Sequence, residues 1–224
     1  MKEVGIIDLS YPVKSEMLVF PGTERPVFQW LGRLNSEGFN LTKFTMLTHT
    51  GTHADAPNHF VDNVPAIDEI PLSSFFGRAK LFRYKKDLRG QEITLDDVMS
   101  SGFELDENII FVLATGIAEF GEKEEYNKIY PVPSEELLGY LIRKRIRCYM
   151  TDATSLDPAG SENSSNHRQL LGAEIPIVEN LRNLHLLPEN KPFLISALPL
   201  MLTGREGAPC RAVAIPEMEG LPFG

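Results

Sequence analysis

A histidine-rich stretch near the N-terminus, L-T-H-T-G-T-H-A-D-A-P-N-H-F at positions 47–60, constrains this chain more than any other segment. It contains three of the five histidines, His49, His53 and His59, with Asp55 among them. Neutral imidazoles and a carboxylate are ligands that borderline divalent metals such as zinc prefer. All four positions are odd-numbered, and residues two apart in an extended chain project to one face. We therefore expect a metal site here.

The stretch must bend to bring these side chains to a single ion. If the chain were fully extended, the six steps from His49 to Asp55 would span roughly 20 Å, whereas metal–ligand distances are about 2 Å. Gly51 permits backbone conformations that other residues avoid, and Pro57 has a backbone φ angle that its ring fixes. We predict a strand over residues 39–48, followed by a turn that gathers the side chains around one point.

Two alternatives to a metal-binding turn follow from the residue types alone. His49 and His53 could lie one helical turn apart, although Thr-Gly-Thr between them disfavours a helix. Each histidine could also be an ordinary polar residue of a core or a surface. The clustering of three histidines in a chain with five is the argument for the metal site.

Length and composition are those of a globular enzyme. The chain has 224 residues, of which 42% are hydrophobic and 24% charged, so we expect a single domain over residues 1–224. The net charge of −9 argues against nucleic acid or an anionic membrane as a partner. Cys148 and Cys210 form no CxxC motif, which indicates a reducing compartment, most simply the cytoplasm. The apolar run at the N-terminus is broken by Asp8, and we expect neither a signal peptide nor a membrane span.

Strands alternate with few helices along the chain, which predicts an α/β domain with a mixed sheet. The clearest helix begins after Ser134, because its leucines and isoleucines form one apolar stripe behind two glutamates. Thr94 is a predicted N-cap of a shorter helix that ends at Ser101. The apolar run 108–114 predicts a strand that is buried on both faces. Further strands are predicted over 4–9, 27–31, 79–84, 147–151, 193–198 and 211–215.

A second polar stretch, T-D-A-T-S-L-D-P-A-G-S-E-N-S-S-N-H-R, starts at Thr151 and contains His167. Long loops of this kind usually have a function or are disordered. Glu179 follows twelve residues after His167, within I-V-E-N-L. Residue types alone are consistent with a surface histidine and with a carboxylate on the face of a helix.

Both stretches resemble the cyclase-like family of metal-dependent hydrolases. H-T-G-T-H-A-D-A-P-N-H-F looks like the signature of that family, and T-D-x-x-S-x-D-P with the later histidine and glutamate is similar to its second half. The resemblance implies a swivelling β/β/α-type fold. It also implies one or two divalent metal ions, zinc or alternatively manganese, and a metal-ligand set of His49, His53, Asp55, His167 and Glu179.

The resemblance also implies a reaction. His59 corresponds to the acid/base histidine of the family, which would protonate a leaving nitrogen, although His59 as a further metal ligand stays open. The implied activity is hydrolysis of a small amide, of which the arylformamidase step of tryptophan catabolism, N-formylkynurenine to kynurenine and formate, is the best-known case. Cyclic imides such as isatin and lactones are alternative substrates.

Two further expectations concern substrate and assembly. Phe20 stands where kynurenine formamidases have a tryptophan that walls the substrate, while packing in the core is the alternative role for a phenylalanine in this loop. The resemblance implies a homodimer or homotetramer. A protein that binds metal or a small molecule without turnover, and a metal with a purely structural role, are the alternatives to an enzyme.

Overall fold

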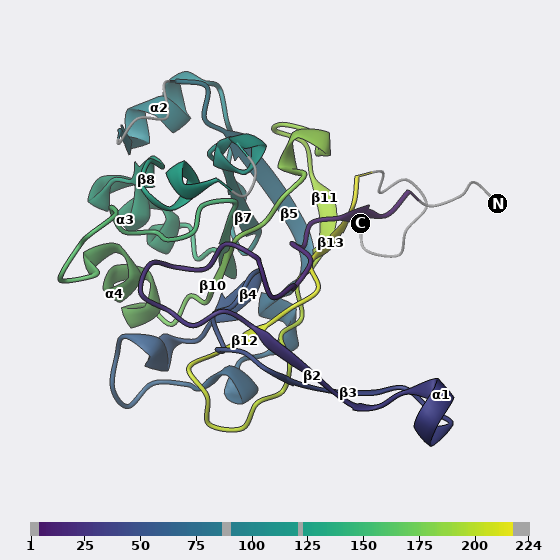
Figure 1. Cartoon of the computed structure of the whole chain (residues 1–224). Helices are drawn as coiled ribbons and strands as arrows, with labels where there is room; N and C mark the ends of the chain where they lie inside the picture. The colour runs from purple at the N-terminus through teal and green to yellow at the C-terminus, as the bar shows by residue number, and fades with distance from the viewer. Residues whose placement is uncertain (1–4, 87–90, 121–122, 217–224) are drawn as a thin grey trace.

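A nine-stranded mixed sheet organises the computed structural model, which describes residues 5–86, 91–120 and 123–216. Its four central strands run parallel: β5 (Phe76–Arg83), β7 (Ile110–Ala114), β9 (Cys148–Thr151) and β10 (Ile177–Glu179). Antiparallel strands extend the sheet on both sides, with β11, β13 and β1 beyond β5, and β4 and β12 beyond β10 (Figure 1). These outer strands are β11 (Phe193–Ser196), β13 (Val213–Ile215), β1 (Ile7–Asp8), β4 (His53–Asp55) and β12 (Gly207–Pro209). The predicted α/β class with a mixed sheet is confirmed.

The sheet has a hydrophobic cluster on each face. Strand β7 shows the alternation, because Ile110 and Val112 belong to one cluster and Phe111 and Leu113 to the other. Every residue of β7 is buried, as predicted for this apolar run. Successive side chains of a strand point to opposite faces, so a run without polar residues fits a strand covered on both sides.

Three helices cover one of these faces: α2 (Leu95–Ser100), α3 (Glu135–Arg143) and α4 (Ser165–Gly172). The predicted N-caps are confirmed, because Thr94 Oγ1 accepts from the Asp97 amide and Ser134 Oγ from the Leu137 amide. Helix α4 lies in a region where sequence indicated only a loop. Short 3₁₀ turns complete the connections at Pro57–His59 (η1), Ile67–Glu69, Leu72–Ser74, Ile117–Phe120, Glu124–Asn127 and Leu184–Leu186, and β6 (Glu92–Ile93) pairs with β8 (Val132–Pro133). None of the helices in the described ranges combines the length and apolar character needed to cross a bilayer.

One predicted strand has a different place in the fold. The segment expected to lead directly into the histidine turn forms β3 (Leu41–Thr45), which pairs with β2 (Val27–Gly32) in a separate ribbon outside the main sheet. All five residues of β3 are exposed. The four-residue helix α1 (Leu34–Glu37) closes the ribbon. The first predicted strand is shorter than expected, and Val4 lies outside the described residues.

The carboxyl ends of β7 and β9 are joined by one buried carboxylate. Asp152 accepts hydrogen bonds from the Thr115 amide at 2.7 Å, the Thr115 hydroxyl at 2.8 Å and the Gly116 amide at 2.9 Å. The two Thr115 donors are buried in the fold and need acceptors. The junction holds the strands that lead to the polar loop beyond Thr151.

We predict that Asp152→Ala destabilises the protein by about 3 kcal/mol, because each buried donor left without an acceptor costs about 1–3 kcal/mol. Urea unfolding measures the change. The exposed Asp62 supplies the control, since Asp62→Ala should stay within about 0.5 kcal/mol of the wild type. Equal effects of both substitutions would contradict the role assigned to Asp152.

Candidate active site

Strand pairing places three of the predicted metal ligands on one face of the sheet. His53 and Asp55 are the first and last residues of β4, so their side chains point the same way. Glu179 lies directly opposite His53 in the antiparallel pair β10–β4. His53 Nε2 is 3.2 Å from Asp55 Oδ1 and 3.7 Å from Glu179 Oε2. The predicted turn therefore ends in a short strand of the main sheet, and Glu179 belongs to a strand rather than a helix.

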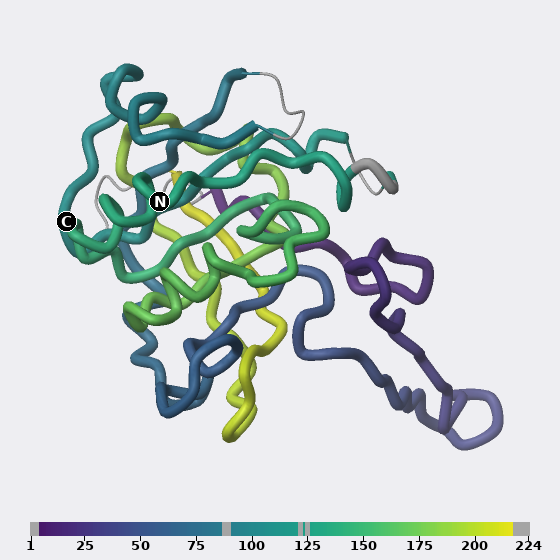
Figure 2. The backbone as a smooth tube through the Cα atoms, turned by 90° about the vertical axis from the view of Figure 1, so that its left-hand side faces the viewer, coloured from purple at the N-terminus to yellow at the C-terminus, as the bar shows by residue number. Residues whose placement is uncertain are grey.

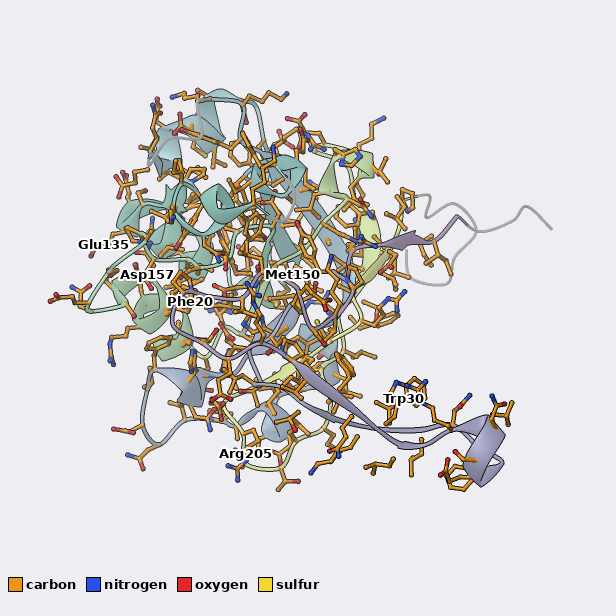
Figure 3. All side chains as sticks on the ribbon, viewed as in Figure 1. Phe20, Trp30, Glu135, Met150, Asp157 and Arg205 are labelled. Carbon is orange, nitrogen blue, oxygen red and sulfur yellow. The ribbon has the colours of Figure 1, made fainter. Side chains whose placement is uncertain are left out.

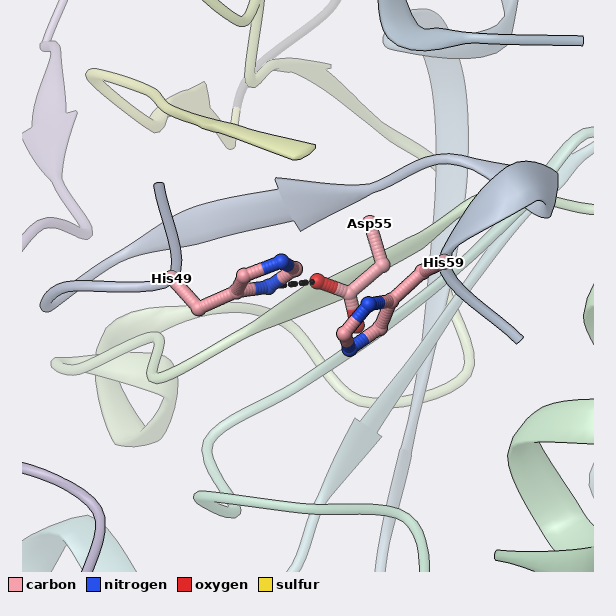
Figure 4. Close-up of side chains that lie close together, drawn as sticks. All are labelled: His49, Asp55 and His59. Atoms are coloured by element: carbon pink, nitrogen blue, oxygen red, sulfur yellow. Dashed lines mark hydrogen bonds and ion pairs between the residues drawn. The ribbon is translucent and has the colours of Figure 1, made fainter. Parts of the chain in front are cut away.

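His49 reaches the same carboxylate from the turn that precedes β4. Its Nδ1 is 2.7 Å from Asp55 Oδ1 (Figure 4). The turn uses the left-handed conformation at Gly51, whose φ is 66°. Gly207 lies opposite Asp55 in β12, and a Cβ there would come within 2.7 Å of His49 Cε1. The bare glycine backbone thus leaves the space that the His49 ring occupies.

His167 joins this group from the far half of the chain. It lies in the first turn of α4, and its side chain is buried rather than at the surface. Its Nε2 is 3.2 Å from Glu179 Oε1 and 3.7 Å from Asp55 Oδ2. The fold therefore brings all five of the predicted metal ligands together, and their role as ligands stays a prediction.

His59 lies beside the cluster rather than at its centre. It ends the 3₁₀ turn η1, which Pro57 begins, and its ring stacks on that of His49 with centroids 4.1 Å apart and planes 24° apart. Figure 4 shows both rings next to Asp55. Donor atoms of His49, Asp55 and His59 lie within 4.8 Å of one another, so the geometry is compatible with His59 as an acid/base group or as a ligand.

A cavity of about 910 Å³ opens onto these residues. Its lining includes all six of the groups described above, and Phe20 lies on its wall. The Phe20 side chain is 47% exposed, which rules out the alternative of a phenylalanine packed in the core. Phe20 and Asp157, both labelled in Figure 3, line this same cavity. Phe20 is thus placed where an aromatic wall would contact a bound molecule.

The donor set fits a divalent cation. Donor atoms of His53, Asp55 and Glu179 lie within 4.8 Å of one another, and all three residues are buried. Burial, together with the nearby charge of Asp55, raises the pKa of Glu179. Two buried carboxylates repel each other when both are ionised, and a cation bound between them would stabilise the ionised pair. Nε2 of His49 is also buried without a hydrogen-bond partner among the described residues.

The carboxylates set the protonation of two imidazoles in the metal-free site. Burial alone would lower the pKa of His53, but Asp55 outweighs it and raises that pKa to about 9. Burial is likewise outweighed at His167, where Asp157 and Glu179 raise the pKa to about 10. His59 behaves in the opposite way, because burial and the neighbouring histidines lower its pKa to about 4. At neutral pH, His59 is therefore neutral, while His53 and His167 hold protons.

Two carboxylates behind the cluster were not among the predicted site residues. Asp157 Oδ2 lies 2.5 Å from His167 Nδ1, so it orients the ring with Nε2 toward Glu179. Glu206 Oε1 accepts from the Thr48 hydroxyl at 2.6 Å and lies 3.6 Å from His49 Nε2. A ligating histidine usually donates its other N–H to a nearby acceptor, and Asp157 is placed to accept in this way from His167, whereas Glu206 is too far from His49 Nε2 for a hydrogen bond.

A sequence signal existed for only one of these two residues. Asp157 is the second aspartate of T-D-x-x-S-x-D-P, ten positions before His167. Glu206 lies in a glycine-rich loop whose approach to His49 depends on the pairing of β12 with β4. His53 has a backbone acceptor instead, since its Nδ1 is 2.8 Å from the Gly51 carbonyl oxygen.

Comparison with known proteins identifies the relatives of this chain. The profile of the family described as "Putative cyclase" matches residues 7–158. The kynurenine formamidase of Salinibacter ruber is 30% identical, and the alignment covers 94% of this chain and 97% of that protein.

Solved structures with the same fold extend this comparison. A predicted metal-dependent hydrolase from Bacillus stearothermophilus matches with a TM-score of 0.77 at 28% identity, covering 94% of this chain and 97% of the other. Isatin hydrolase A from Labrenzia aggregata has a TM-score of 0.84 at 24% identity, covering 95% and 94%, which shows a shared fold. Because the family profile spans more than half of its residues, the chain belongs to the cyclase family.

Proposed function

We propose that this protein is a metal-dependent arylformamidase that hydrolyses N-formylkynurenine to kynurenine and formate. The observation that carries the proposal is the convergence of five metal-ligand candidates, a neutral histidine and an exposed phenylalanine in one cavity. The kynurenine formamidase relative supports the class of reaction, hydrolysis of a carbon–nitrogen bond other than a peptide bond. The solved structure described as a predicted metal-dependent hydrolase supports the use of a metal. A cavity of about 910 Å³ suits a small aryl amide.

The metal would be held by His49, His53, Asp55, His167 and Glu179. Zinc is the ion we propose, with manganese as the alternative, because imidazole and carboxylate donors suit both. When bound, such an ion lowers the pKa of water from 15.7 to about 7 and polarises a carbonyl oxygen. Asp157 and the Gly51 carbonyl oxygen would keep the imidazoles of His167 and His53 oriented.

His59 would move the proton that the reaction requires. Its low pKa leaves the imidazole neutral at pH 7, so it can first accept a proton from the attacking water. The same nitrogen can then return that proton to the leaving amine. The proton-transfer role thus begins with His59 as a base and ends with His59 as an acid.

Phe20 would hold the aryl group of the substrate. Its ring lines the cavity and is half exposed, so an aromatic substrate can stack on it. Hydrolysis of a cyclic imide such as isatin, or of a lactone, is the second candidate, supported by the fold shared with isatin hydrolase A.

The buried Cys148 and the partly buried Cys210 are both free thiols, which supports a cytoplasmic location.

We predict that the purified protein contains at least one divalent metal per chain and hydrolyses formanilides. Removal of the metal by a chelator should abolish turnover, and zinc or manganese should restore it, as measured by metal analysis and a formate assay. A panel with isatin and a lactone identifies the preferred substrate. Protein that is free of metal and fully active would contradict the proposal, whereas unfolding on chelation would indicate a structural metal.

His59→Ala should lower kcat by about 10²–10⁴-fold, which is the usual contribution of a positioned acid or base. Metal content should stay at the wild-type level if His59 is not a ligand. His185 is the matched control, because it is an exposed histidine outside the site, and His185→Ala should leave kcat unchanged. Loss of metal in His59→Ala would assign it to the ligand set instead, and unchanged turnover would remove it from the reaction.

Metal uptake should release protons at neutral pH. The pKa of His53 is raised to about 9 and that of His167 to about 10, so both imidazoles are protonated at pH 7 in the metal-free protein. Ligating nitrogens must lose those protons, and the apparent metal affinity should therefore rise with pH between 7 and 9. Calorimetry of zinc binding in buffers of different ionisation enthalpy counts the protons. A heat that is independent of the buffer at pH 7 would contradict the assignment of these ligands.

A further inference from the structure

One basic side chain lies among the acidic groups of the active-site cavity. Lys128 is the one lysine or arginine among the described residues that line it. It lies in the turn that follows the 3₁₀ turn Glu124–Asn127, and it is exposed. Four carboxylates line the same cavity: Asp55, Asp157, Glu179 and Glu206. A lysine ammonium is a compact positive charge with three donors, so it gives the cavity a place for an anion apart from the metal-ligand cluster.

Buried tyrosines on both sides of Lys128 attach this turn to the cavity. The Tyr126 hydroxyl donates to Asn180 Oδ1 at 3.2 Å, and the Tyr130 hydroxyl donates to the Asp157 carbonyl oxygen at 2.9 Å. Both tyrosines are buried, and both acceptors belong to residues that line the cavity. The backbone at Lys128 is therefore held in place relative to the cavity by its neighbours in the chain.

A third hydrogen bond connects the turn with the loop that carries Phe20. Asn127 is buried, and its Nδ2 donates to the Val19 carbonyl oxygen at 2.7 Å. Val19 and Asn127 are the chain neighbours of Phe20 and Lys128. Figure 2 shows the chain before β2 (purple) and the segment before β8 (teal) on the same side of the molecule. The aromatic wall and the ammonium group thus line one cavity from two segments that are bonded to each other.

A ligand that stacks on Phe20 and also reaches Lys128 must combine an aryl group with an anion. N-formylkynurenine has this form, because a short chain links its aryl ketone to an amino acid carboxylate. A hydrogen bond between an ammonium and a carboxylate is among the stronger ones in proteins. The acidic lining and the net charge of −9 disfavour an anionic ligand that lacks such a partner. Isatin and formanilide carry no carboxylate and would make no use of Lys128.

We propose that Lys128 binds the carboxylate of the substrate and makes the enzyme prefer aryl formamides with an anionic side chain. This inference rests on the proposed arylformamidase activity and adds to it a residue that determines specificity. The carboxylate is remote from the amide that is cleaved, so the contact is equally strong in the ground state and in the transition state. Uniform binding of this kind lowers KM and leaves kcat unchanged.

Three substrates that share one formylated aryl ketone separate this contact from the chemistry. They are N-formylkynurenine, its analogue without the amino group, and ortho-formamidoacetophenone, which lacks both the amino group and the carboxylate. The wild type should have a higher kcat/KM for the two anionic substrates. Lys128→Met should raise their KM about tenfold, as expected for one charge-assisted contact at a partly exposed site. The KM for the uncharged ketone should change less than about twofold, because it makes no such contact. Lys128→Arg should restore most of the preference.

Lys191 supplies the control, because it is exposed and lies outside the cavity lining. Lys191→Met removes the same charge from the chain and should leave all three KM values unchanged in a formate assay. Equal losses on all three substrates in Lys128→Met, an unchanged KM for the anionic pair, or a wild type without preference would each overturn the proposal. Hydrolysis of the uncharged ketone would still support the arylformamidase activity in those cases. A wild type that hydrolyses none of the three would refute the proposed function and this inference with it.

Discussion

The pairing of β4 between β10 and β12 is the constraint on which the site depends. This pairing sets His53 opposite Glu179 and Asp55 opposite the glycine that admits His49. A shift of one residue in either register would turn both β4 side chains to the other face of the sheet. The apolar neighbours would then occupy the cavity, and the ionisable groups would enter the hydrophobic cluster on the opposite side. The hydrophobic pattern of the sheet therefore stabilises the arrangement of the polar site.

Local pattern predicted much of the site because β4 is short and nearly extended. The equal parity of His53 and Asp55 placed them on one face, as the strand does. Glu179 and His167 could not be placed in this way, because their approach depends on the β10–β4 register and on a helix that starts among serines and asparagine, which are weak helix formers. Glu206 reaches His49 through the pairing of β12 with β4, which no local pattern encodes.

The predicted strand at 39–48 shows a different limit of sequence analysis. Its threonine, phenylalanine and leucine content favours a strand, and β3 is one. Strand propensity indicates that a side chain suits a pleated, half-buried surface. It does not indicate which other residues bury that surface. Phe39, Leu41 and Phe44 have the composition of a buried strand while they lie in water in the single chain. The composition of this segment therefore predicts a strand but not its place in the fold.

Charge balance explains how a fold can build the cluster before any metal is bound. Asp55 and Glu179, when both are ionised, place two negative charges in a buried space, where an unpaired charge is costly. Protonated His53 and His167 supply two positive charges at 3.2–3.7 Å from these oxygens. A divalent cation would supply the same charge in the same place as the two protons leave. The site can therefore exchange protons for metal without changing its net charge, and the surrounding sheet does not need to rearrange to stay electrostatically balanced.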